Sequence, residues 1–151
     1  MQSLKVLKLL VITGLLISLA LSLRTKSKFS PLGVLYILFS PHWRLLRYII
    51  AQAKVESANF TSNVYLTDNN MFGMKQNSRP YDTPGLVAPD GGRYAHYKND
   101  FDSIRDFVAY LAQTNFPTTV PGVEQYALEM KTRYQYGPSA SIYQQNLELW
   151  L

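Results

Sequence analysis

The sequence predicts a mainly α-helical domain (α+β class) with a small irregular or β-containing lobe, preceded by an N-terminal hydrophobic helix. Apolar residues recur at spacings of three and four in several segments, which indicates helices with one buried face. Residues 76–92 are rich in Pro, Gly, Asp and Asn and show no period, which predicts the irregular lobe. A length of 151 residues suits one domain and an appendage, and we place the boundary between residues 1–28 and 29–151.

The N-terminal appendage contains an uncharged apolar run at residues 9–23. Extending this run back to residue 4 brings in two charged residues, Lys5 and Lys8. A helix of this length spans about 30 Å, the thickness of a bilayer core. We therefore expect residues 4–23 to anchor the chain in a lipid membrane, followed by a basic linker. The alternative is a signal peptide cleaved after Ala20-Leu21-Ser22, in which case the protein is secreted without residues 1–22.

Charge is distributed unevenly along the chain. The first 50 residues hold seven basic and no acidic side chains, whereas the other 101 hold eight basic and ten acidic ones. Basic residues beside an apolar run favour a membrane neighbour, and we expect no nucleic-acid partner. The chain has no cysteine, and its two histidines, His42 and His96, lie far apart. Disulfides and thiol catalysis are therefore excluded, and neither a metal site nor a cofactor is expected.

The folded part begins with residues 30–43, an apolar stretch that we interpret as the first helix of the domain or a membrane-surface segment. A helix after Pro41 follows from the buried stripe of Leu45, Leu46, Ile49, Ile50 and Ala53. Continuing this stripe places Glu56 on or beside the buried face. Short strands are expected near Leu86-Val87 and residues 93–97.

Three more helices complete the expected domain. Asp100 or Asp102 caps the first, Pro121 starts the second, and Ser139 or Ser141 caps the third. Their buried stripes consist of Phe101, Ile104, Phe107 or Val108 and Leu111, then Val123, Tyr126, Ala127 and Met130, and finally Tyr143, Leu147 and Trp150.

Glu56 is the strongest candidate for chemistry. A carboxyl group that leans on apolar surface loses hydration, so its charged form is disfavoured and its pKa rises. A general acid near neutral pH needs this property, and glycosidic cleavage needs a proton on the leaving oxygen. The residues on either side add to this argument.

The run AQAKVES…S…TDNNMFGMK, at residues 51–75, resembles the signature AQAxxESxxGxS…NNxFGxK of glucosaminidase domains that cut bacterial peptidoglycan, glycoside hydrolase family 73. A second motif of that family, F-R-x-Y followed by Ser and D-x-x-x-L, is similar to residues 94–97, Ser103 and residues 106–111. Its terminal Y-x-x-D-P-x-Y is echoed by Tyr136, Pro138 and Tyr143. The resemblance covers about residues 42–151. The chain departs from the pattern at Ala58 and Phe60, where glycines are usual, and at Ala95, where arginine is usual.

The resemblance implies a lysozyme-like fold, in which Glu56 is the proton donor and Tyr97 lines the cleft and orients a sugar or a water. It further implies substrate binding by residues of the signature and its neighbours, namely Ser62, Asn69, Asn70, Phe72 and Tyr94. Capping of the loop is the alternative role for the asparagines. Phe72 fits equally a core position, and Tyr94 favours a structural one.

The second catalytic group stays open among Asp68, Asp82, Asp90 and Asp100, with Asp90 as the first choice. A carboxylate about 6.5–9.5 Å from the acid implies inversion, whereas the acetamido group of the substrate could replace it. The predicted function is thus a membrane-anchored peptidoglycan hydrolase facing the cell wall or periplasm, or in a phage virion membrane. The alternative is a non-catalytic peptidoglycan-binding or structural protein on the same fold.

Overall fold

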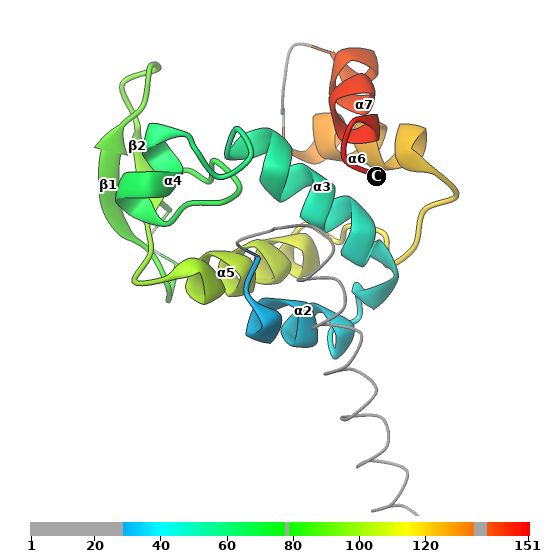
Figure 1. Cartoon of the computed structure of the whole chain (residues 1–151), viewed down its shortest axis with the longest axis horizontal. Coiled ribbons are helices and arrows are strands. Elements are labelled where there is room, and N and C mark those ends of the chain that lie inside the picture. Colours follow the sequence, from blue (N-terminus) through cyan, green and yellow to red (C-terminus); the bar gives the residue numbers. More distant parts are fainter. Residues whose placement is uncertain (1–28, 78, 135–138) are drawn as a thin grey trace, which may run out of the picture.

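The computed structural model describes residues 29–77, 79–134 and 139–151 (Figure 1). The predicted anchor or signal peptide, the motif residues Tyr136 and Pro138 and the basic linker all lie outside these ranges. Among the described residues, no helix combines the length and apolar character needed to cross a membrane.

The described chain is mainly helical with one small antiparallel sheet, as the sequence predicts. Its elements are α2 (Pro31–Leu38), the single-turn helix η1 (Trp43–Leu45), α3 (Leu46–Glu56), α4 (Asn63–Asp68), β1 (Thr83–Val87), β2 (Arg93–His96), α5 (Asp100–Gln113), α6 (Val123–Tyr134) and α7 (Ala140–Glu148).

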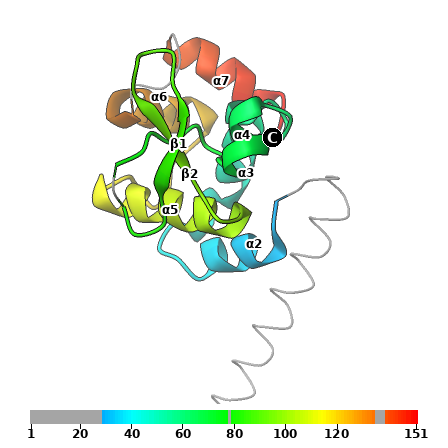
Figure 2. The same ribbon diagram turned by 90° about the vertical axis from the view of Figure 1, so that its left-hand side faces the viewer.

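Helix α3 crosses the middle of the molecule and separates its two sides (Figure 1). The β1–β2 hairpin and α4 lie on one side, and α6 and α7 lie on the other. Helices α5 and α2 run beneath them, and Figure 2 shows the hairpin facing the viewer with α4 beside it. The C-terminal end of α3 therefore points toward the hairpin side, while its flank packs against α7.

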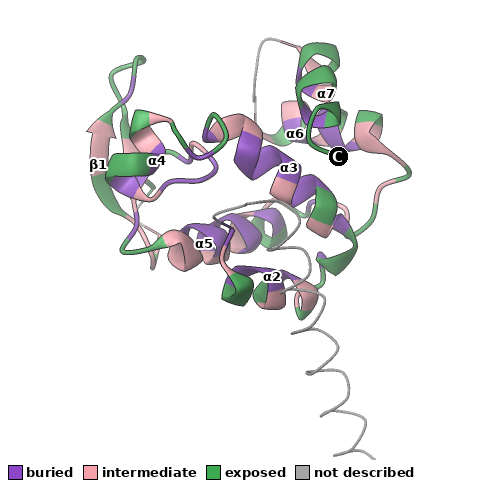
Figure 3. Ribbon diagram, in the orientation of Figure 1, coloured by how far each residue is buried: buried purple, intermediate pink, exposed green. Residues whose placement is uncertain are grey.

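The core lies around α3 and α5, whose facing surfaces are buried (Figure 3). Phe72 stacks on Phe107 of α5 with ring centroids 4.1 Å apart. Tyr48 of α3 stacks on Tyr126 of α6 with ring centroids 5.1 Å apart. The first contact holds the loop after α4 against α5, and the second holds α3 against α6.

The β1–β2 hairpin is held to α4 through Asp68. The register pairs Thr83 with His96. Strand β1 contains residues 86–87, where the sequence predicts a strand. The Asp68 carboxylate accepts a hydrogen bond from the Leu86 backbone N–H at 2.9 Å. Gly85 allows this approach, because a Cβ at that position would stand 2.6 Å from Asp68 Oδ2.

Several predicted boundaries are confirmed and three are wrong. Residues 31–38 form the first helix of the domain, and Ser139 caps α7 by accepting from the Ile142 N–H at 3.2 Å. Asn99, not Asp100 or Asp102, caps α5, because its extended backbone lets its side chain accept from the Asp102 N–H. The two aspartates instead occupy the first turn, where the positive end of the helix dipole favours negatively charged side chains.

The other two errors concern helix ends. Helix α6 begins at Val123, since Pro121 and Gly122 form a bend before it. Trp150 lies beyond α7, which ends at Glu148, so it does not continue the buried stripe of Tyr143 and Leu147. Its side chain is 38% exposed.

Candidate active site

Glu56 is the last residue of α3, and its side chain is partly accessible to solvent. The helix before it is anchored by Ile49 and Ala53, which are fully buried. One turn before Glu56, the Gln52 side-chain oxygen accepts a hydrogen bond from the Tyr126 hydroxyl of α6 at 2.5 Å. Helix packing therefore sets the position of the Glu56 carboxyl group.

Helix α3 stops at Glu56 because the backbone then turns left-handed. Ala58, Asn59 and Phe60 have φ angles of 50°, 54° and 65°. Ser57 stabilises this turn, since its hydroxyl donates to the Ala53 carbonyl at 2.6 Å and accepts from the Phe60 N–H at 2.8 Å. A left-handed backbone costs a non-glycine residue roughly 1–2 kcal/mol. The helix therefore ends directly after Glu56 through a turn whose backbone is strained.

The environment of Glu56 favours its protonated form. Burial raises the pKa of Glu56 to about 7, and a hydrogen bond from the Tyr143 hydroxyl of α7 opposes part of that rise. At neutral pH a substantial fraction of the carboxyl groups therefore carries a proton, which is the state that a general acid needs.

Gly73 brings the loop after α4 against Glu56. Its φ angle is +61°, a conformation that favours glycine, and a Cβ at this position would stand 3.6 Å from Glu56 Oε2. The loop backbone therefore forms one wall beside the carboxyl group. This placement explains why the sequence puts a glycine so soon after the asparagine pair.

The two asparagines hold this loop in place. Asn69 ends α4 in a left-handed conformation, and its side-chain amide donates to the Tyr97 carbonyl at 2.9 Å. Asn70 is buried, and its amide donates to the Met74 and Ala95 carbonyls at 2.9 Å each. Its oxygen accepts from the Met74 N–H at 3.0 Å. Asn70 thus ties the loop to β2, as the loop-capping alternative predicts.

Ser62 and Phe72 also have structural contacts here. The Ser62 hydroxyl caps α4 by accepting from the Tyr65 N–H at 3.2 Å. Phe72 is fully buried against Phe107, so in this structure its ring has no accessible face for a sugar. The core position is the one of its two predicted roles that the geometry supports.

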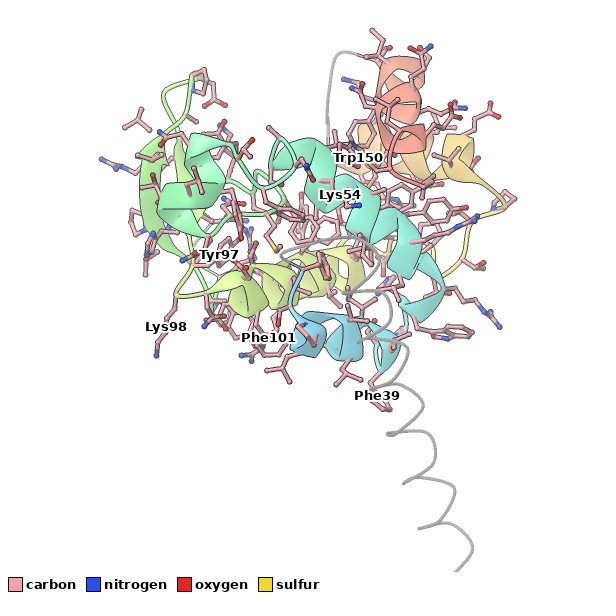
Figure 4. The ribbon with its side chains drawn as sticks, viewed as in Figure 1. Phe39, Lys54, Tyr97, Lys98, Phe101 and Trp150 are labelled. Carbon is pink, nitrogen blue, oxygen red and sulfur yellow. The ribbon has the colours of Figure 1, made fainter. Side chains whose placement is uncertain are left out.

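Tyr97 is buried next to α5 rather than exposed to solvent (Figure 4). Its hydroxyl donates to Asp106 Oδ2 at 2.6 Å, and the Arg79 guanidinium contacts both oxygens of the same carboxylate at 2.6 and 2.8 Å. Burial and the bond to Asp106 raise the pKa of Tyr97. Tyr97 is therefore fixed in its protonated form between the hairpin and α5.

The first-choice second carboxylate, Asp90, lies in the loop between β1 and β2 and is exposed. It pairs with Lys75 at 2.9 Å, and the hydrogen bond from Lys75 holds the pKa of Asp90 below its usual value. Asp90 is therefore ionised at neutral pH, as a base must be. The Lys75 ammonium also lies 4.5 Å from the centroid of the half-buried Tyr94 ring, so it links Tyr94 to Asp90.

The other three candidate acids hold backbone or side-chain partners. Asp68 binds the hairpin and lies 3.1 Å from His96 Nδ1. Asp82 accepts from the Asn77 N–H at 2.9 Å, and Asp100 accepts from the Tyr65 hydroxyl at 3.1 Å. Among the described residues, no group of three His, Asp or Glu side chains could hold a metal ion.

The family model of the glucosaminidases, described as mannosyl-glycoprotein endo-β-N-acetylglucosaminidase, matches residues 45–149. The chain belongs to the glucosaminidase family. It is therefore a glycoside hydrolase, and the matched region of this glucosaminidase runs from the last residue of η1 to just beyond the end of α7. Searches of the curated proteins and of the solved structures gave no significant match.

The departures of this glucosaminidase from the expected motif now have a structural meaning. Ala58 and Phe60 replace the usual glycines at two of the left-handed positions, and Phe60 is buried against Tyr65 with ring centroids 5.5 Å apart. Packing of the Phe60 ring therefore offsets some of the strain. Ala95 is fully buried on β2, where its backbone bonds Asn70 and Met74.

Sequence reasoning missed three residues of the glucosaminidase site. Tyr143 was assigned only to a buried stripe and a terminal motif, and its contact with Glu56 joins distant parts of the chain. Arg79 and Asp106 form a buried ion pair that supports Tyr97. A signal for Asp106 was present, because it aligns with the Asp of the D-x-x-x-L motif at residues 106–111, and the structure shows it buried in α5, where an acid needs a partner.

Proposed function

We propose that this glucosaminidase hydrolyses the glycan strand of peptidoglycan beside N-acetylglucosamine, with Glu56 as the general acid. The observation that carries the proposal is Glu56 itself, a half-buried carboxyl with a pKa near 7 at the end of α3 in a glycoside hydrolase domain. Glycosidases of most families use such an acid to protonate the leaving oxygen. The match of the peptidoglycan-cutting signature at residues 51–75 supports the choice of substrate.

In the proposed reaction, Glu56 transfers its proton to the bridging oxygen as the bond from that oxygen to the anomeric carbon breaks. Water then adds to the anomeric carbon and gives up a proton. Asp90, which is ionised and exposed, is the first candidate to accept that proton. The acetamido group of the substrate is the alternative, since it can attack the anomeric carbon before water does. Tyr97 and Asp106 act by positioning the loop and hairpin around Glu56.

We further propose that residues 4–23 tether the enzyme to a membrane, either in a bacterial envelope or in a phage virion that contains one. The apolar run with flanking basic residues supports the tether, which would keep a small enzyme near the wall that it cuts. Cleavage after residue 22 is the alternative and would release a secreted enzyme.

A non-catalytic peptidoglycan-binding protein is the second candidate, because Ala58, Phe60 and Ala95 depart from the family pattern. The full chain in detergent micelles, incubated with purified murein sacculi, separates the two. We expect soluble fragments whose new reducing ends, identified by mass spectrometry, are N-acetylglucosamine. Reducing ends on N-acetylmuramic acid would contradict the glucosaminidase specificity. Binding without release of fragments would favour the second candidate.

A further inference from the structure

A groove of about 400 Å³ lies between the C-terminal ends of α3 and α7. Polar and aromatic side chains line it together with apolar ones: Lys54, Asn59, Asn146, Trp150, Val55 and Leu149. Figure 4 shows Lys54 and Trp150 lying close together at this place. None of these side chains has a part in the proposed reaction, so we ask which ligand the groove could bind.

Lys54 is an unusual residue for such a groove. Only 8% of its surface is exposed, and its ammonium group lies 5.0 Å from the centroid of the Trp150 ring. Within the described ranges, no carboxylate lies within ion-pair distance of it. Burial lowers the pKa of Lys54 below its usual value. A partly desolvated cation that has no carboxylate partner in these ranges gains from an added anion.

The other lining residues suit a sugar. Trp150 is 38% exposed and offers a flat apolar face, while the side-chain amides of Asn59 and Asn146 supply hydrogen-bond donors and acceptors. Leu149 adds apolar surface and is 77% exposed. A flat aromatic face with a few polar groups is a common arrangement in small-molecule sites.

The groove lies beside the end of α3, because Ala58 and Asn59, which line it, belong to the turn that follows Glu56. Tyr143, which hydrogen-bonds Glu56, lies one helical turn before Asn146 on α7. Lys54 and Glu56 are two residues apart on α3, so their side chains point about 200° apart around its axis. A ligand that reaches both must therefore pass the end of α3, at the turn of Ser57 to Phe60.

We propose that this α3–α7 groove is a substrate subsite that binds a carboxylate-bearing acetamido sugar unit, with Lys54 pairing the carboxylate and Trp150 stacking on the sugar. The inference rests on the proposed function, because it names which part of the glycan binds beyond Glu56. The carboxylate can belong to the lactyl group of N-acetylmuramic acid or to a peptide attached to it. Both sources offer the same anion on the same sugar.

Trp150 fluorescence tests the subsite directly. The full chain in detergent micelles carries Trp43→Phe, so that Trp150 is the one reporter, and Glu56→Gln, so that no ligand is consumed. Three probes are titrated: the disaccharide of N-acetylglucosamine and N-acetylmuramic acid, the same disaccharide with its peptide, and the neutral N,N′-diacetylchitobiose. We expect at least one acidic probe to bind about tenfold more tightly than the neutral probe, and less so at high salt. The acidic probe that binds more tightly identifies the source of the carboxylate.

Lys54→Met should bring the affinity for the acidic probes down to that for chitobiose, and Lys54→Arg should restore most of it. Lys98→Met is the matched control, since Lys98 is exposed and lines a different groove, and its affinities should equal those of the parent. Equal affinity for all three probes, or acidic binding that survives Lys54→Met, would overturn the subsite. Such a result, with hydrolysis by the enzyme that retains Glu56 intact, would leave the proposed function standing.

Discussion

At the scale of single residues, the chemistry of this enzyme depends on how Glu56 keeps its proton. Burial disfavours the charged carboxylate, whereas the hydrogen bond from Tyr143 favours it, and the balance leaves the pKa of Glu56 at about 7. Because the general acid must be protonated, the rate should fall as the pH rises through about 7. The pKa of Glu56 thus depends on one hydroxyl group, that of Tyr143.

Tyr143→Phe removes the hydrogen bond that lowers the pKa of Glu56. The pKa should therefore rise, and the alkaline limb of kcat/KM against pH should move to higher pH. Tyr36→Phe is the control, because Tyr36 is 37% exposed on α2 and stacks edge-on against Phe101. A limb that moved to lower pH in Tyr143→Phe, or moved equally in the control, would contradict the account.

At the scale of elements, the turn after α3 is strained, and that strain is open to test. Ala58 is exposed and has a φ angle of 50°, so a glycine at this position would remove the steric cost without losing packing. We expect Ala58→Gly to raise the free energy of unfolding by up to about 1 kcal/mol, measured by urea denaturation. Ala53→Gly, in the interior of α3, is the comparison and should lower it. A destabilised Ala58→Gly variant would show that the turn is not strained.

The link between the hairpin and α5 depends on Asp106, which is fully buried and binds both Arg79 and Tyr97. Asp106→Asn removes the closer of the two carboxylates that pair with Arg79 and leaves Asp82 Oδ2, 3.6 Å away, as its charge partner. We expect a loss of about 3 kcal/mol in the free energy of unfolding. Asp90→Asn, at the exposed ion pair with Lys75, should leave the urea midpoint unchanged. Equal midpoints for the two variants would mean that the buried pair does not stabilise this link.

The helices could be predicted from the sequence because their buried stripes follow the helical period, and Ile49, Ala53, Phe107 and Leu111 are all fully buried. The partners of site residues could not be predicted in the same way. Asp106 pairs with Arg79, which lies 27 residues earlier in a segment without helical or strand periodicity. Contacts between such distant residues leave no local pattern in a sequence. Similarly, the groove was missed because Trp150 was counted as part of the α7 face, whereas the helix ends before it.

At the scale of the whole molecule, the chain joins a domain with as many basic as acidic side chains, at residues 29–151, to a basic, apolar N-terminal region. This division suits an enzyme held at a membrane while its domain acts on a nearby wall. We expect the full chain expressed in bacteria to stay in the membrane pellet after alkaline carbonate washing. Deletion of residues 1–28 should move it to the supernatant. A soluble product of the full-length gene with its N-terminus at residue 23 would show instead that a signal peptide is removed.

Proton donation by Glu56 is the claim on which the other proposals depend, and the rate of murein digestion by Glu56→Gln tests it most directly. Glutamine keeps the shape of the side chain but has no proton to give, and general acid catalysis contributes typically 10²–10⁴-fold. With circular dichroism showing an unchanged fold, we predict that the variant releases muropeptides at least about a hundredfold more slowly than the parent. Digestion by Glu56→Gln at the parental rate would contradict the assignment of Glu56 as the acid.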